Sequence, residues 1–180
     1  LKAMSGFDPK DSTSAKIEVP DYEQKLEKDI RGLRIGLAKE YSLKKGDSVT
    51  KRKWEQAISL LSNMGAEIVE VSLPHTEFAL PTYYVLAPAE ASSNLARYDG
   101  VRYGHRATLD TNDSILELYE KTRSEGFGTE VKRRILIGTY VLSSGYYDAY
   151  YKRAQKVRSL IMNDFHEVFK KVDLILTPTT

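Results

Sequence analysis

The stretch AEIVEVSLP, residues 66–74, decides the fold of this chain. Its apolar residues alternate with polar ones, several of them are β-branched, and a proline ends the run. This pattern predicts a β-strand over about residues 66–73. The stretch LRIGLAKEY, residues 33–41, is also apolar and predicts an earlier strand over about residues 33–39.

A helix is predicted between these two strands. KKGD at residues 44–47 predicts a turn, and the residues that follow carry an apolar stripe at a helical period that ends before Gly65. The stripe consists of Trp54, Ala57, Ile58, Leu61 and Met64. A strand, a helix and a strand predict a βαβ unit over residues 33–73 with two parallel strands.

The rest of the chain divides around this unit. Residues 1–32 predict a polar linker with a short helix at about residues 21–30, and residues 74–171 are helical in pattern. VDLILTP predicts a third strand over residues 173–177, inside a last segment 172–180. We therefore expect an α/β fold with a few strands and many helices, in one unit over residues 1–180.

Local signals divide the helical region. Pro81 and Pro88 predict a broken helix after Pro74. Ser114 and Glu117 have the spacing of a capping box at the start of a helix. Two further helices are expected at about residues 129–144 and 146–171.

Composition excludes several classes of function. The chain has no cysteine, so disulfides, thiolate metal sites and cysteine nucleophiles are excluded. A net charge of +2 is too small to indicate nucleic-acid binding by itself. No apolar run has the length that a membrane span needs, and no secretory leader pattern is present.

The ends of the chain resemble interior segments. Residues 1–5 read as the last turn of a helix, and DLILTPTT at the other end reads as a buried strand followed by a proline turn. We expect both ends to be severed from a longer protein, and ordinary frayed termini are the alternative.

Arg134 is the residue that the helical pattern singles out. On a wheel at about 100° per residue, Val131, Ile135, Gly138 and Leu142 form a buried stripe. Arg133 points away from the stripe, whereas Arg134 lies on its flank, one turn before Gly138. A guanidinium beside a missing side chain has room for a carboxylate, which it can bind through two hydrogen bonds. The alternative is an arginine at the surface that pairs with a neighbouring acidic residue.

Other polar clusters carry less chemistry. The group Tyr146, Tyr147, Tyr150 and Tyr151 covers one helix face and is expected to pack against a neighbouring element. A charged run from Lys152 to Arg158 is expected to be solvated. The three histidines share no metal-ligand spacing, and Ser143 and Ser144 lack a nearby base in the sequence. We predict no metal site.

Several longer stretches resemble a known family when they are taken together. They include ASSNLARYDGVRYG, TRSEGFGTEVKRRILIGTY and LSSGYYDAYYKRAQKVR, and the resemblance covers nearly the whole chain. They are similar to the A subunits of tRNA-dependent amidotransferases, a branch of the amidase signature family. The resemblance implies an α/β/α fold around a mixed sheet.

The resemblance also implies a reaction and partners. Members of this branch hydrolyse glutamine, or asparagine, through a Lys–Ser–Ser triad. The ammonia amidates glutamate carried on tRNA(Gln) or aspartate carried on tRNA(Asn). The B subunit of such an enzyme uses ATP and magnesium for that step, and the C subunit holds the other two together. The implied location is the cytoplasm or an organelle matrix. No cofactor is expected in this chain, and tRNA is expected to act through the complex.

Two positions match substrate-binding residues of the family. Arg134 matches the arginine that holds the α-carboxylate, and Tyr83 matches a tyrosine beside the glutamine, with Tyr84 as its neighbour. No position matches the triad, which is expected upstream of Leu1, so we expect no catalytic residue here and no activity of the chain alone. The alternatives are a stand-alone module that binds an amino acid or a partner protein, and another hydrolase of the family.

Overall fold

The centre of the fold is a small parallel β-sheet. The computed structural model of the chain describes residues 1–26, 29–41 and 48–179. In that part, three strands pair in the order β2-β1-β3, and both pairings are parallel. They are β1 (Arg34–Ala38), β2 (Glu67–Val71) and β3 (Leu174–Leu176). The predicted α/β class and the three predicted strands are confirmed.

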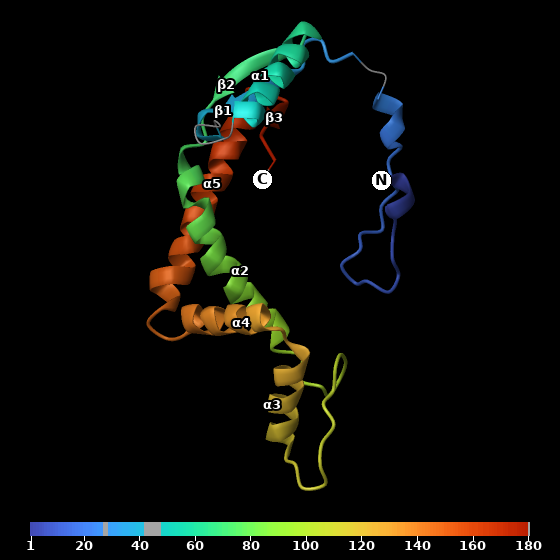
Figure 1. The fold of residues 1–180 in the computed structure, drawn as a ribbon, viewed down its shortest axis with the longest axis vertical. Coiled ribbons are helices and arrows are strands. Elements are labelled where there is room, and N and C mark those ends of the chain that lie inside the picture. Colours follow the sequence, from blue (N-terminus) through green and yellow to red (C-terminus); the bar gives the residue numbers. More distant parts are fainter. Residues whose placement is uncertain (27–28, 42–47, 180) are drawn as a thin grey trace.

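The helices extend away from the sheet. Figure 1 shows α2 and α5 side by side below the sheet, α4 crossing near their lower end, and α3 farthest away. The α-helices are α1 (Ser48–Asn63), α2 (Ala79–Leu95), α3 (Ile115–Gly126), α4 (Thr129–Leu142) and α5 (Arg153–Phe169). The 3-10 helices are η1 (Lys2–Met4), η2 (Tyr22–Lys25), η3 (Lys39–Tyr41) and η4 (Pro74–Phe78), and η5 (Tyr147–Lys152) is a π-helix.

The main hydrophobic core joins the end of α5 to one face of the sheet. Its buried members come from β1, from the end of β2 and the residues after it, and from the chain around the end of α5. They are Ala38, Val71, Leu73, Val168 and Val172. Since β1 is the central strand, this contact fixes the direction in which the helical region leaves the sheet.

Glu40 ties the end of β1 to the end of β2. Its carboxylate accepts hydrogen bonds from the backbone N–H of Leu73 at 2.8 Å and from the hydroxyl of Ser72 at 2.6 Å. Partial burial acts to raise the pKa of the Glu40 carboxyl, but these two donors outweigh it, so the pKa lies below its usual value. The folded state therefore favours the ionised carboxylate.

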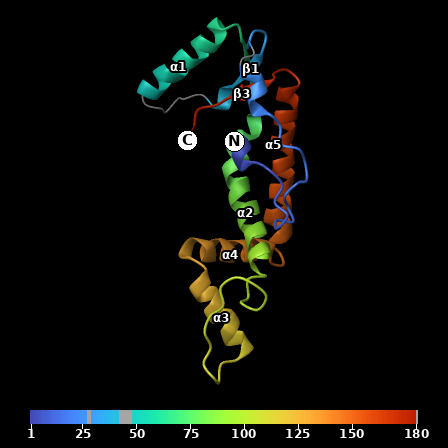
Figure 2. The ribbon, with the colours of Figure 1, turned by 90° about the vertical axis from the view of Figure 1, so that its right-hand side faces the viewer.

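Helix α1 forms where the sequence predicts it but covers little of the sheet. Figure 2 shows α1 projecting away from the strands. Trp54, Ile58 and Leu61 on its apolar stripe are half-buried, and Ala57 and Met64 are exposed. The stripe is thus present without a full partner among the described residues.

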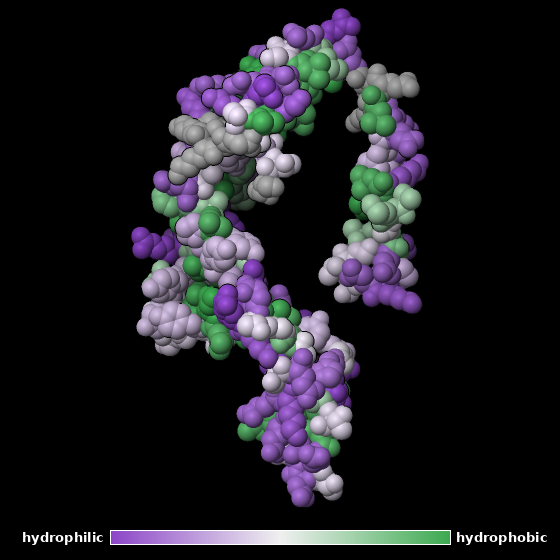
Figure 3. All heavy atoms as spheres, in the orientation of Figure 1, coloured by the Kyte–Doolittle hydropathy of each residue, from purple (hydrophilic) through white to green (hydrophobic). Residues whose placement is uncertain are grey.

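The chain exposes a large surface for its mass. Its accessible area is 13835 Å², whereas a compact monomer of 20.4 kDa exposes about 8,800 Å². Large apolar side chains are exposed along the first 26 residues, including Leu1, Met4 and Ile17. Figure 3 shows green patches on this N-terminal arm, which stands apart from the helices in that view.

The predicted break in the helix after Pro74 is wrong. Helix α2 runs without interruption through both prolines. Pro81 lies in its first turn, where a backbone N–H has no partner within the helix, so proline costs little there. Pro88 lies inside the helix and is buried. The tertiary contact of α2 with α4 at Pro88 outweighs the loss of one hydrogen bond.

The boundaries of the later helices also differ from the prediction. Helix α4 ends at Leu142 because the backbone of Ser143 is extended, and Gly145 follows with a φ of +86°. The predicted helix at 146–171 is a π-helix followed by an α-helix that ends at Phe169. The short helix predicted at 21–30 is one 3-10 turn, η2. Its residues 27–28, and the turn predicted at 44–47, lie outside the described residues.

The predicted capping box at the start of α3 is confirmed. The backbone N–H of Ser114 donates to Glu117 Oε2 at 2.6 Å, and the N–H of Glu117 donates to Ser114 Oγ at 3.3 Å. Each residue satisfies a backbone donor that the helix leaves unpaired. The start of α3 is therefore fixed by local sequence alone.

Candidate anion-binding site around Arg134

Helix α4 approaches α2 very closely at Gly138. A Cβ atom built on Gly138 would lie 2.0 Å from the carbonyl oxygen of Pro88 and 2.7 Å from Ser92 Oγ. The space beside Gly138 is therefore filled by the backbone of α2. This corrects the expectation that the missing side chain leaves room for a ligand, because the glycine serves helix contact instead.

The same contact sets the exposure of the two arginines. The Arg134 side chain is 35% exposed, whereas that of Arg133 is 67% exposed. This agrees with the position of Arg134 on the flank of the buried stripe. The structure thus separates two adjacent arginines in the way that the helical pattern predicts.

Arg134 is held by two neighbours. Its Nη1 donates to the hydroxyl of Tyr83 at 3.0 Å, and its Nε donates to Glu130 Oε1 at 3.1 Å. These two contacts, the tyrosine first, raise the pKa of Arg134, so the guanidinium is always charged. Its Nη2 has no hydrogen-bond partner among the described residues. The surface alternative is therefore also realised, since Arg134 does pair with an acidic residue.

Tyr83 comes from α2 and completes this arrangement. The structure brings together the two residues that the sequence selected, although they are far apart in the chain. The ring of Tyr84 lies edge-on to that of Tyr83, at 5.4 Å between centroids. Of these two tyrosines, Tyr83 is the one whose hydroxyl bonds to Arg134.

A groove between α2 and α5 runs past Tyr83. Its volume is about 410 Å³, which lies within the range of small-ligand pockets. Its walls are mostly apolar, with a carboxylate on α2 and a guanidinium on α5. The lining residues are Ala79, Thr82, Tyr83, Leu86, Ala87, Glu90, Arg158 and Ile161. Tyr83 therefore borders both Arg134 and this groove.

Three residues of the tyrosine cluster, Tyr147, Tyr150 and Tyr151, lie within π-helix η5, and Tyr146 directly precedes it. The rings of Tyr140 and Tyr146 are 4.3 Å apart between centroids, and the hydrogen bond that the Tyr140 hydroxyl donates to Tyr146 raises the pKa of Tyr140 to about 12. Tyr151 donates to Glu90 on α2 at 2.9 Å. The expected contact with a neighbouring element is thus found at Tyr151, while other rings contact one another.

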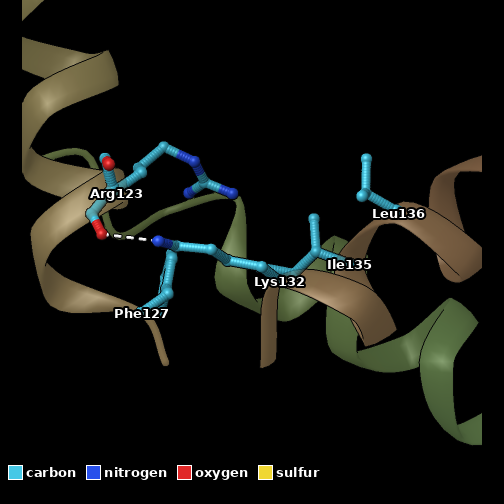
Figure 4. Close-up of a pocket in the computed structure, with 6 residues that line it drawn as sticks. Arg123, Phe127, Lys132, Ile135 and Leu136 are labelled. Carbon is cyan, nitrogen blue, oxygen red and sulfur yellow. Dashed lines mark hydrogen bonds between the residues drawn. The ribbon is translucent and has the colours of Figure 1, made fainter. Parts of the chain in front are cut away.

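A second pocket lies between α3 and α4. Figure 4 shows its lining, and its volume is about 330 Å³. Arg123 Nη1 donates to the carbonyl of Leu95 at 2.8 Å, at the end of α2, and Lys132 Nζ donates to the carbonyl of Ser124 at 2.6 Å, near the end of α3. Cations stabilise helix C-termini. We therefore assign these two side chains a structural role.

Ser143 and two of the three histidines have structural partners. Ser143 Oγ donates to the carbonyl of Tyr140 at 2.7 Å and so caps α4. His75 Nδ1 lies 2.9 Å from Asp164 Oδ1, and His105 Nε2 lies 2.9 Å from Glu125 Oε2. Within the described residues, no three histidine or acidic side chains cluster in a way that could hold a metal ion.

One residue of the site escaped sequence reasoning. Glu130 bonds to Arg134 through Oε1 and to Arg133 through Oε2, the latter at 3.2 Å. Its spacing of three and four residues from the two arginines is the signal that points to it. That spacing is common on helix surfaces, so it does not by itself indicate a site.

No helix within the described part of the chain combines the length and the hydrophobicity needed to cross a membrane.

Comparison with known proteins yields a consistent group. A family described as Amidase matches residues 1–180. The chain is 62% identical over its whole length to the A subunit of the glutamyl-tRNA(Gln) amidotransferase of Roseobacter denitrificans, and 62% identical to that of Ruegeria pomeroyi. It spans 37% and 36% of those two relatives.

Solved structures agree with this group. The crystal structure of the A subunit of the glutamyl-tRNA(Gln) amidotransferase from Thermotoga maritima superposes with a TM-score of 0.62 at 35% identity. It covers 97% of this chain, which corresponds to 32% of that protein. A bacterial aryl acylamidase superposes with a TM-score of 0.63 at 20% identity, a likeness of fold alone.

Proposed function

The chain belongs to the amidase family, and from this premise we propose that it is part of the glutamine-hydrolysing subunit of a tRNA-dependent amidotransferase. The high identity to the A subunits described above supports this branch of the family over the other hydrolases. Because the chain spans little more than a third of those relatives, the activity of a whole protein is part of the proposal.

The contact between Arg134 and Tyr83 is the observation that carries the proposed role. An arginine at the edge of a core, with one nitrogen lacking a partner among the described residues, can bind a carboxylate through two parallel hydrogen bonds. We assign the α-carboxylate of glutamine to Arg134. Tyr83 orients the guanidinium and borders the bound amino acid.

The chemical step needs groups that residues 1–180 do not supply in a matching motif. A serine outside them would attack the side-chain amide of glutamine, forming an acyl-enzyme as the C–N bond breaks and ammonia leaves. Water would then release glutamate. In this proposal the present residues bind and orient the substrate, and the chain by itself is inactive.

The remaining partners follow from the same proposal. The ammonia would pass to a B subunit, where ATP and magnesium serve to convert Glu-tRNA(Gln) to Gln-tRNA(Gln), and a C subunit would hold the complex together. The overall reaction is that of a carbon–nitrogen ligase with glutamine as the amide donor. No cofactor is assigned to this chain, tRNA acts through the complex, and the location is the cytoplasm or an organelle matrix.

Glutamine binding tests the role of Arg134. The protein encoded by the complete reading frame that contains this chain would be titrated with glutamine by calorimetry. A charge-assisted bidentate contact is worth about 1.5–3 kcal/mol, so Arg134→Ala should weaken binding roughly ten- to a hundredfold. Arg134→Lys should give an intermediate loss, because lysine keeps the charge but not the planar fork.

Arg52→Ala is the matched control, since Arg52 is an exposed arginine on α1. It should bind glutamine as the unmodified protein does. Equal affinity of the Arg134→Ala and Arg52→Ala variants would overturn the assignment of Arg134. Sustained release of ammonia from glutamine by residues 1–180 alone would contradict the account of the missing nucleophile.

A further inference from the structure

Glu130 bridges two arginines on one face of α4. Its Oε1 lies 3.1 Å from Arg134 Nε, and its Oε2 lies 3.2 Å from Arg133 Nη1. The Glu130 side chain is 57% exposed, so water reaches the bridge. A single carboxylate therefore serves both guanidinium groups.

The charges in this group do not balance. Two arginines and one glutamate carry a net charge of +1, because both arginines are always charged. Among the described residues, neither arginine has a second carboxylate within 4 Å. The group therefore lacks one negative charge. The Nη2 of Arg134 has no partner among the described residues and is the position at which a further anion can bind.

We propose that Glu130 is a resident carboxylate that the substrate displaces from Arg134 and that Arg133 then retains. This inference rests on the proposed function, in which Arg134 binds the α-carboxylate of glutamine. In the empty site Glu130 occupies Nε of Arg134. In the occupied site the substrate carboxylate pairs with Arg134 and the Glu130 carboxylate pairs with Arg133. The two negative charges are then apart from each other.

The geometry makes this exchange easy. Exposed ion pairs between residues four apart on a helix are weak, so the substrate needs little binding energy to displace Glu130. Arg133 already holds the second oxygen, so Glu130 keeps a partner without a large movement. Arg133, which the helical pattern describes only as a solvated residue, thereby gains a role as the residue that receives Glu130.

Four variants of the complete protein test this exchange by their affinity for glutamine. Glu130→Gln removes the competing charge and should tighten binding about two- to fivefold, the range of an exposed ion pair. Arg133→Ala leaves Glu130 on Arg134 and should weaken binding by a similar factor. The double variant Glu130→Gln/Arg133→Ala should bind as Glu130→Gln does, because Arg133 acts only through Glu130. Arg134→Ala shows how much affinity for glutamine is lost when the contact with the carboxylate is removed completely.

Two controls make the result specific. Glu167→Gln removes a comparably exposed carboxylate, 66% against 57%, from an ion pair with Lys170 on the C-terminal side of α5 and should leave binding unchanged. Glutamine α-amide lacks the carboxylate, so its binding should not respond to changes at Glu130 or Arg133.

The outcomes separate this inference from the function on which it rests. Weaker glutamine binding by Glu130→Gln would overturn the exchange and make Glu130 a residue that merely holds Arg134 in place. Equal effects of the variants on glutamine and on its α-amide would overturn it as well. If Arg134→Ala itself leaves glutamine binding unchanged, the proposed function fails.

Discussion

Gly138 offers the sharpest test of how α2 and α4 position the site. In Gly138→Ala the new methyl carbon would lie 2.0 Å from the Pro88 carbonyl oxygen, whereas ordinary contact begins at 3.4 Å. The helices must therefore move apart by about 1.4 Å, the difference between these two distances. Backbone atoms on α2 cannot rotate aside as a side chain would.

The size of the effect follows from two opposing contributions. Alanine inside a helix is favoured over glycine by about 1 kcal/mol. Overfilling a close contact costs about 1–3 kcal/mol, and contact with backbone points to the upper end or beyond. We expect a net destabilisation of about 2 kcal/mol, which for a chain of this size lowers Tm by about 4–8 °C.

Thermal unfolding followed by far-UV circular dichroism measures this change. Gly126→Ala at the end of α3 is the matched control, because its Cβ would lie 3.4 Å from the nearest atom, a ring carbon of His105. The control should be neutral or slightly more stable. The same displacement should separate Arg134 from Tyr83 and weaken glutamine binding. A Gly138→Ala protein as stable as the Gly126→Ala protein would refute the reasoning.

Further predictions concern pH and stability. The pKa of Glu40 is lowered in the folded chain, so its contribution to the free energy of unfolding is complete above the usual glutamate pKa of about 4.3. This contribution declines as the pH falls through the folded pKa. Glu40→Gln should therefore remove this part of the acid dependence of stability, as measured by urea unfolding. Tyr140 should titrate near pH 12 by ultraviolet absorbance, and Tyr146→Phe should return its pKa towards 10; an unchanged titration would contradict the bond. His75→Ala leaves the Asp164 carboxylate, only 11% exposed, with one bond from the backbone N–H of residue 75, so we expect a loss of about 1–3 kcal/mol in unfolding free energy, whereas a neutral result would make the pair dispensable.

Sequence reasoning found the features that depend on local pattern. The strand at 66–73 follows from alternating β-branched residues, and the start of α3 follows from Ser114 and Glu117, whose side chains reach only their own turn. The difference between Arg133 and Arg134 follows from helical periodicity. Each of these needs only the neighbours along the chain.

Two of the errors occurred where distant segments meet. From the sequence, Pro88 predicts a break in the helix, whereas in the structure Pro88 packs against Gly138 on α4 and the helix continues. From the sequence, Gly138 suggests an empty space, whereas in the structure the backbone of α2 fills that space. One tertiary contact therefore accounts for both errors. The role of Glu130 escaped prediction for a different reason, since its spacing to the arginines is common on exposed helices.

The π-helix η5 has a consequence for how this chain tolerates insertions and deletions. A π-helix spans five residues per hydrogen-bonded step rather than four, as if one residue had been added to an α-helix. Deleting one residue within Tyr147–Lys152 should let the segment rewind as α-helix while α5 keeps its length. Because the wide turn already holds the added residue, the segments on its two sides would keep their relative orientation after the deletion. A homologue shorter by one residue in this segment should therefore keep the contact between α5 and α2.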